Sequence, residues 1–218
     1  MSETERLGAL IARAYQIIGR ETPLPADCGK LCGAACCRDG GDQTGTPDFG
    51  GGASGMDSDA SGSDGDAPDF GGDNGSNETP GGGEPSGDDE AAPDALGMLL
   101  FPGEADALFG VEGFHISRIR YLDSRVWFLV CEGTCERRLR PLACRIFPLA
   151  PHVGGDGAVS ALPDPRARRM CPLADGEFLQ PRFRRAVGKA LRALAQEPKM
   201  LEFMRLISAE LDELRRFM

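Results

Sequence analysis

The chain has 218 residues, which is enough for one ordinary domain with an appendage. Its formal charge of −10 is unevenly distributed: residues 38–97 hold 15 of the 34 acidic residues and one of the 24 basic ones, so the other 158 residues carry +4. The acidic start of the chain is unlike a secretory signal, and no apolar run approaches the roughly 18 residues of a membrane helix. We therefore predict a cytoplasmic protein with no membrane association.

The N-terminal region, residues 2–19, is predicted to be a helix. Ser2 and Glu5 have the spacing of a capping box, and Gly19 is a plausible end. The apolar residues at helical spacing fall on one face, namely Leu7, Leu10, Ile11, Ala14 and Ile18. A proline-containing loop then leads to Cys28. We assign residues 1–37 to this helix and the first cysteine loop.

Residues 38–97 are predicted to be a long disordered insert. They contain 17 of the 30 glycines, many Asp and Ser residues and almost no branched apolar side chains. Such a composition buries too little apolar surface to offset the entropy of ordering the chain.

Ordered structure is predicted to resume over residues 98–218, with two hairpins followed by two helices. Residues 98–101 are a strand and residues 102–108 a short helix. The first hairpin pairs residues 115–122 with 125–131 across Asp123 and Ser124, and the second pairs 145–150 with 158–162 across a Gly-rich turn. The helices are separated by Pro198, and their apolar faces are Phe183, Val187, Ala190, Leu191 and Leu194 in the first and Leu201, Met204, Leu211 and Leu214 in the second. The expected fold class is α+β, a small metal-stabilised domain with short antiparallel strands and flanking helices.

Eight cysteines are the main chemical feature of the sequence. The first half of the pattern is a loop, and the second half follows the insert; together they are Cys28, Cys32, Cys36, Cys37, Cys131, Cys135, Cys144 and Cys171. Thiols stay reduced in the cytoplasm, which disfavours four disulfides. Thiolates at short spacing bind zinc or an iron–sulfur cluster, and a tetrahedral site needs four of them. All eight are therefore candidate metal ligands, in one site or in two.

The cysteine pattern also resembles the CxxCxxCC family, which is described as zinc- or iron-chelating. The matching residues are the four cysteines of the first loop, then Cys135 and the run Arg140-Pro141-x2-Cys144-Arg145-x-Phe147-Pro148. The resemblance implies a bound iron–sulfur cluster or zinc, and a loosely defined redox or protein-modifying role. The spacings from Cys28 to Cys32 and from Cys32 to Cys36 are each one residue longer than in that family.

Three functions are compatible with these features. The first is an iron–sulfur protein with a redox or modification-linked role, and the second is a structural zinc module that binds an unidentified protein partner. The third is nucleic-acid binding through a basic helix face with Arg182, Arg185, Lys189 and Arg192. Nucleic-acid binding is the least favoured of the three functions, because no aromatic platform is expected beside that face. No catalytic residue is predicted.

Overall fold

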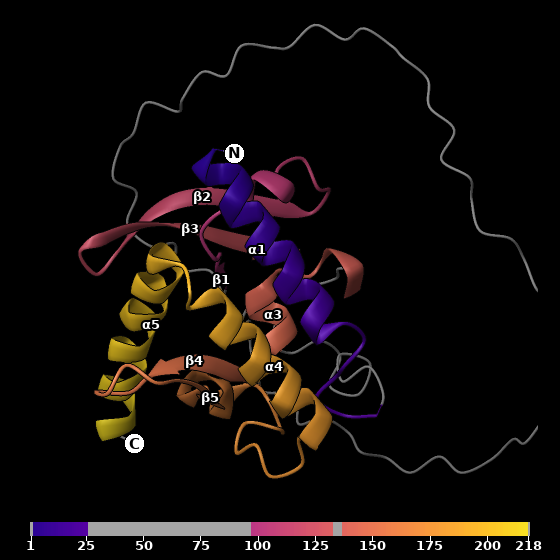
Figure 1. Cartoon of the computed structure of the whole chain (residues 1–218). Coiled ribbons are helices and arrows are strands. Elements are labelled where there is room, and N and C mark those ends of the chain that lie inside the picture. The colour runs from indigo at the N-terminus through magenta and orange to yellow at the C-terminus, as the bar shows by residue number, and fades with distance from the viewer. Residues whose placement is uncertain (1, 26–96, 133–136, 218) are drawn as a thin grey trace, which may run out of the picture. The chain divides into compact units, whose positions relative to one another are not determined.

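Two small antiparallel sheets and four α-helices make up the part of the protein that the computed structural model describes, residues 2–25, 97–132 and 137–217 (Figure 1). All of these residues belong to one unit of the chain. The predicted insert, apart from Gly97, lies outside the described residues.

The first helix, α1, spans Glu3–Ile18 and confirms the prediction for the N-terminus. The Ser2 hydroxyl accepts a hydrogen bond from the Glu5 N–H (3.2 Å), while the Ser2 N–H donates to the Glu5 carboxylate (2.6 Å). This capping box satisfies two amide groups that a helix start leaves without partners. The helix ends at Gly19, whose φ of 54° is readily adopted only by glycine.

The first sheet has the strand order β1-β3-β2, with β1 at Met98–Leu99, β2 at Phe114–Tyr121 and β3 at Ser124–Cys131. A short 3₁₀ turn, η2 (Ala105–Ala107), follows β1. The predicted hairpin is confirmed, with Tyr121 opposite Ser124 and Phe114 opposite Cys131. Its turn is formed by Leu122 and Asp123, one residue earlier than predicted.

The second sheet pairs β4 (Leu149–Val153) with β5 (Val159–Pro163), which confirms the second hairpin. The predicted start of its first strand at Arg145 is wrong, because the short helix α3 (Leu142–Ile146) includes that residue. Leu142 and Ile146 are four residues apart and both buried, so they share one helix face toward the core. Two apolar residues in a five-residue segment do not reveal a helical period, so the sequence did not predict this helix.

The last two helices, α4 (Pro181–Leu194) and α5 (Pro198–Arg216), complete the core. The predicted apolar face of α4 is buried throughout, and α5 buries Met200, Phe203 and Ile207 in addition to Met204 and Leu211. Helix α1 packs against α4, α4 against β5, and α5 against β4 (Figure 1). The α+β class with short antiparallel strands and flanking helices is confirmed. None of the helices in the described ranges has the length and apolar run needed to span a bilayer.

Candidate functional site

Of the eight predicted metal ligands, three lie in the described part of the chain. Cys131 is in β3, Cys144 is in α3, and Cys171 follows the 3₁₀ segment η4 (Pro165–Arg169). All three side chains are half-buried. The other five, Cys28, Cys32, Cys36, Cys37 and Cys135, lie outside the described residues.

Cys131 ends β3 in apolar surroundings. It lies opposite Phe114 in the hairpin and packs against a small cluster of buried side chains formed by Leu100, Ala105, Leu108 and Leu129. The cluster that Cys131 packs against is therefore apolar.

Cys144 lies instead in a helix that is anchored by a buried carboxylate. Glu104 is 1 % exposed, although it is charged by type. Its Oε1 accepts a hydrogen bond from the Leu142 N–H (2.5 Å), its Oε2 accepts one from the Phe101 N–H (3.1 Å), and the Tyr15 hydroxyl also donates to it. One carboxyl group therefore joins α1, the segment after β1 and the first turn of α3, two residues from Cys144.

The titration of this group reflects its burial. Removal from water raises the pKa of Glu104, while hydrogen bonds from Tyr15, Leu142 and Phe101 and the charge of Arg145 oppose that rise. Burial also raises the pKa of Tyr15, and the negative charges of Glu104 and Cys144 add to the rise. Tyr15 is therefore a neutral donor at physiological pH, close enough to Cys144 to sense its charge.

Arg145 holds the segment that precedes α3. Its guanidinium lies 4.2 Å from the centre of the Tyr15 ring, within the range of a cation–π contact. It also donates hydrogen bonds to the carbonyl oxygens of Arg138 (2.6 Å) and Arg140 (2.8 Å). These contacts fix the backbone between the 3₁₀ turn η3 (Arg137–Leu139) and the helix that carries Cys144.

The described residues that lead to the remaining cysteines lie next to each other. Arg137 Nη2 donates to the Glu21 carbonyl oxygen (2.5 Å), and the Gln180 backbone N–H donates to that of Pro23 (2.9 Å). In the sequence, Cys28 follows Pro23 by five residues and Cys135 precedes Arg137 by two. The segment before the first cysteine loop is thus hydrogen-bonded to Arg137, the first described residue after Cys135.

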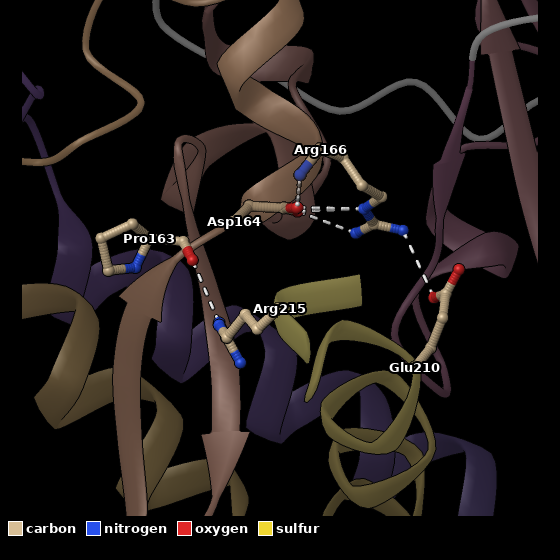
Figure 2. A network of polar contacts seen from close by, with 5 residues as sticks. All are labelled: Pro163, Asp164, Arg166, Glu210 and Arg215. Atoms are coloured by element: carbon tan, nitrogen blue, oxygen red, sulfur yellow. Dashed lines mark hydrogen bonds and ion pairs between the residues drawn. The ribbon is translucent and has the colours of Figure 1, made fainter. Parts of the chain in front are cut away.

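A separate polar network holds η4, the segment that precedes Cys171 in the chain (Figure 2). Asp164 is 4 % exposed; it accepts hydrogen bonds from the backbone N–H of Arg166 (2.9 Å) and from its guanidinium (2.8 Å), which caps η4. The same guanidinium forms an ion pair of 3.6 Å with Glu210 on α5. The Cys171 N–H donates to the carbonyl oxygen of Ala167 in η4 (2.8 Å), so the backbone of Cys171 is joined to the capped segment.

The three described thiols do not form a metal site by themselves. Within the described ranges, no group of three or more His, Cys, Asp or Glu side chains is placed to hold a metal ion. The two histidines are each near a carboxylate instead, His115 at 3.4 Å from Glu132 and His152 at 3.4 Å from Asp212.

Sequence reasoning did not single out Glu104 or Tyr15. Glu104 follows the apolar run Leu99-Leu100-Phe101 closely, and an acidic residue beside such a run was the available signal. Its partners come from α1 and α3, which are distant in sequence, so their identity required the fold.

Comparison of the chain with known protein families, with curated proteins and with solved structures finds no match. The likeness to the CxxCxxCC family thus depends on the motif residues themselves, of which the run 140–148 is described and surrounds Cys144.

Proposed function

We propose that this chain is a cytoplasmic metal-binding protein that chelates iron as an iron–sulfur cluster, with zinc as the alternative metal. The ligands are thiolates drawn from both halves of the eight-cysteine pattern, and Cys144 is the described cysteine whose surroundings support this role best. When bound, an iron–sulfur cluster supplies one-electron transfer, which agrees with the redox-linked role implied by the family resemblance.

The observation that carries the proposal is the meeting of the segments that lead to the two cysteine groups. Arg137 is hydrogen-bonded to Glu21, and Arg145 of α3 lies on the ring of Tyr15 in α1. The two halves are separated by 93 residues between Cys37 and Cys131. Contacts that bring their flanking segments together are what a shared metal site requires, and the metal would then also stabilise the fold.

The surroundings of Cys144 suit an anionic metal–thiolate centre. Arg145 lies next to Cys144 in the chain and supplies positive charge, and burial keeps Tyr15 neutral by raising its pKa. Positive charge around thiolates tunes the potential of an iron–sulfur cluster. Glu104 orients α3, which carries Cys144, and does not act as a ligand in this proposal because its oxygens already accept three hydrogen bonds.

A structural zinc module that presents a binding surface is the second candidate. The observation that favours it is the rigid attachment of the segment around Cys144, through two backbone carbonyls and a buried carboxylate. Structural zinc sites are closed and four-coordinate, and four thiolates can supply all of their ligands.

Metal analysis tests the proposal and separates the two candidates. We expect full-length protein isolated without oxygen to be coloured and to contain iron and acid-labile sulfide. A colourless protein with stoichiometric zinc would establish the second candidate in place of the first. A protein that contains neither metal after isolation, and binds neither on reconstitution, would refute both.

Substitution of Cys144 tests the ligand assignment. Cys144→Ser is expected to lower the metal content per chain, whereas Cys131→Ser, a matched change in the apolar cluster, is expected to leave it unchanged. Equal metal content in wild type and Cys144→Ser would show that Cys144 is not a ligand.

A further inference from the structure

The outward side of α4 is a continuous basic surface. Arg182, Arg185, Lys189 and Arg192 are all exposed, on the side of the helix opposite its buried residues. We call these four residues the basic face. At 1.5 Å of rise per residue, they extend over about 15 Å.

Among the described residues, no carboxylate forms an ion pair with this face. Helix α4 contains no acidic residue, and none occurs in the sequence between Glu177 and Glu197. Within the described ranges, none of the four side chains of the basic face takes part in an ion pair. Like charges three or four positions apart destabilise a helix, so the four cations of the basic face repel one another and lower the stability of α4.

Two other cations of the protein, near the starts of α1 and α5, are paired with carboxylates. Arg6 of α1 forms an ion pair with Glu197 before α5 (2.7 Å), and Lys199 of α5 pairs with Glu3 of α1. These two cations have acidic partners, which the four side chains of the basic face lack within the described residues.

An exposed aromatic side chain precedes the basic face in the sequence. Phe178 is 73 % exposed and precedes Arg182 by four residues. Its neighbours fix the backbone: Leu179 is buried, its N–H donates to the Gly176 carbonyl oxygen (3.2 Å), and Arg184 of α4 donates to the same oxygen. The ring is therefore presented to solvent by an anchored turn. The sequence argument against nucleic acid was the lack of an aromatic platform, and Phe178 supplies one.

We propose that the basic face and Phe178 bind single-stranded nucleic acid without sequence preference. The four cations contact successive phosphates, and an unpaired base stacks on the Phe178 ring. An acidic protein segment would use the cations but has no need of the ring. A membrane surface would require exposed apolar side chains along α4, which its outward side does not provide. This inference is independent of the metal centre.

Salt dependence measures the contribution of the phosphate contacts. We would follow fluorescence anisotropy of labelled 20-nucleotide oligo-dT and oligo-rU with the full-length chain, starting at about 50 mM salt. Four phosphate contacts predict that log K falls with log salt with a slope of about −3. Lys189→Gln should reduce this slope by about 0.7. Arg205→Gln, which removes an exposed cation of α5 outside the basic face, is the matched control and should leave the slope unchanged.

Stacking is tested separately. Phe178→Ala should weaken binding about 5- to 150-fold with an unchanged salt slope, and Phe178→Trp should retain affinity. Phe217 is 82 % exposed at the end of α5, so Phe217→Ala is the matched control and should have no effect. The proposal is overturned by no binding at the lowest salt, by an unaffected Phe178→Ala, by tighter binding to a 20-base-pair duplex, or by polyglutamate competing as well as the oligonucleotides.

Discussion

The segments around Cys131 and Cys144 belong to one cysteine pattern but are held in place by different forces. Cys131 packs among apolar side chains at the end of a hairpin. Cys144 belongs to a five-residue helix that is anchored by the carboxylate of Glu104 and the guanidinium of Arg145. A cysteine motif thus groups residues by spacing, whereas the fold divides them by the polarity of their surroundings.

The difference between the two segments indicates how each contributes. Apolar packing is tolerant of small, volume-conserving changes, so the packing around Cys131 should tolerate a change of that kind. A short helix is marginal in isolation, and α3 depends on polar groups supplied by other elements. The region around Cys144 should therefore be the more sensitive of the two to single substitutions.

Glu104→Ala should give the largest loss of stability. The substitution leaves the buried N–H groups of Phe101 and Leu142 and the Tyr15 hydroxyl without their acceptor. Unsatisfied buried donors cost about 1–3 kcal/mol each, so we expect the free energy of unfolding to fall by about 3–5 kcal/mol. Urea denaturation monitored by circular dichroism measures this change. A loss below about 1 kcal/mol would show that water replaces the carboxylate and that the hydrogen bonds to Glu104 do not anchor α3.

The pH dependence of stability should carry the signature of the same carboxyl group. Burial raises the folded-state pKa of Glu104 above its ordinary value of 4.5, so folding favours the protonated form. Its contribution is fully present below pH 4.5 and is lost as the pH rises through the folded-state pKa. Glu104→Gln removes this titration. The difference in unfolding free energy, wild type minus Glu104→Gln, should therefore decrease from pH 4.5 toward pH 8, whereas parallel curves would contradict the raised pKa.

Arg145→Ala should have an intermediate effect. It removes two hydrogen bonds from a charged donor to the backbone of Arg138 and Arg140, and the contact with the Tyr15 ring. Because these groups are partly exposed, we expect a loss of about 2 kcal/mol. Arg145→Lys should recover little, because an ammonium group cannot match the planar fork of donors. Full recovery by lysine would reduce the role of Arg145 to its charge.

The sequence predicted those elements whose signals are local. The capping box of Ser2 and Glu5, the periodicity of α4 and the hairpin β4–β5 were all evident from nearby residues, and all are confirmed. The start of β4 was misplaced because α3 is too short for its helical period to be read. The stability of α3 comes instead from Glu104, which accepts a hydrogen bond from Leu142 and is 38 residues away from it in the sequence.

The candidate site was predictable only in its residue types. The motif identified Cys144 and Arg145, but its spacing did not anticipate the contacts of Arg145 with Tyr15 and two carbonyls. Tyr15 and Glu104 carry no motif, and their importance comes from contacts across 89 residues. Such long-range partners follow from packing and not from spacing.

Cys131→Val should have the smallest effect and is the sharpest test of the comparison. Valine is close to cysteine in volume and suits both the strand and the apolar cluster, so the unfolding free energy should change by less than about 1 kcal/mol. The metal content should equal that of the wild type, whereas Cys144→Val should lower it. If Cys131→Val loses metal as Cys144→Val does, Cys131 is a ligand despite its apolar surroundings, and packing would then be a poor guide to which thiols of this pattern bind the metal.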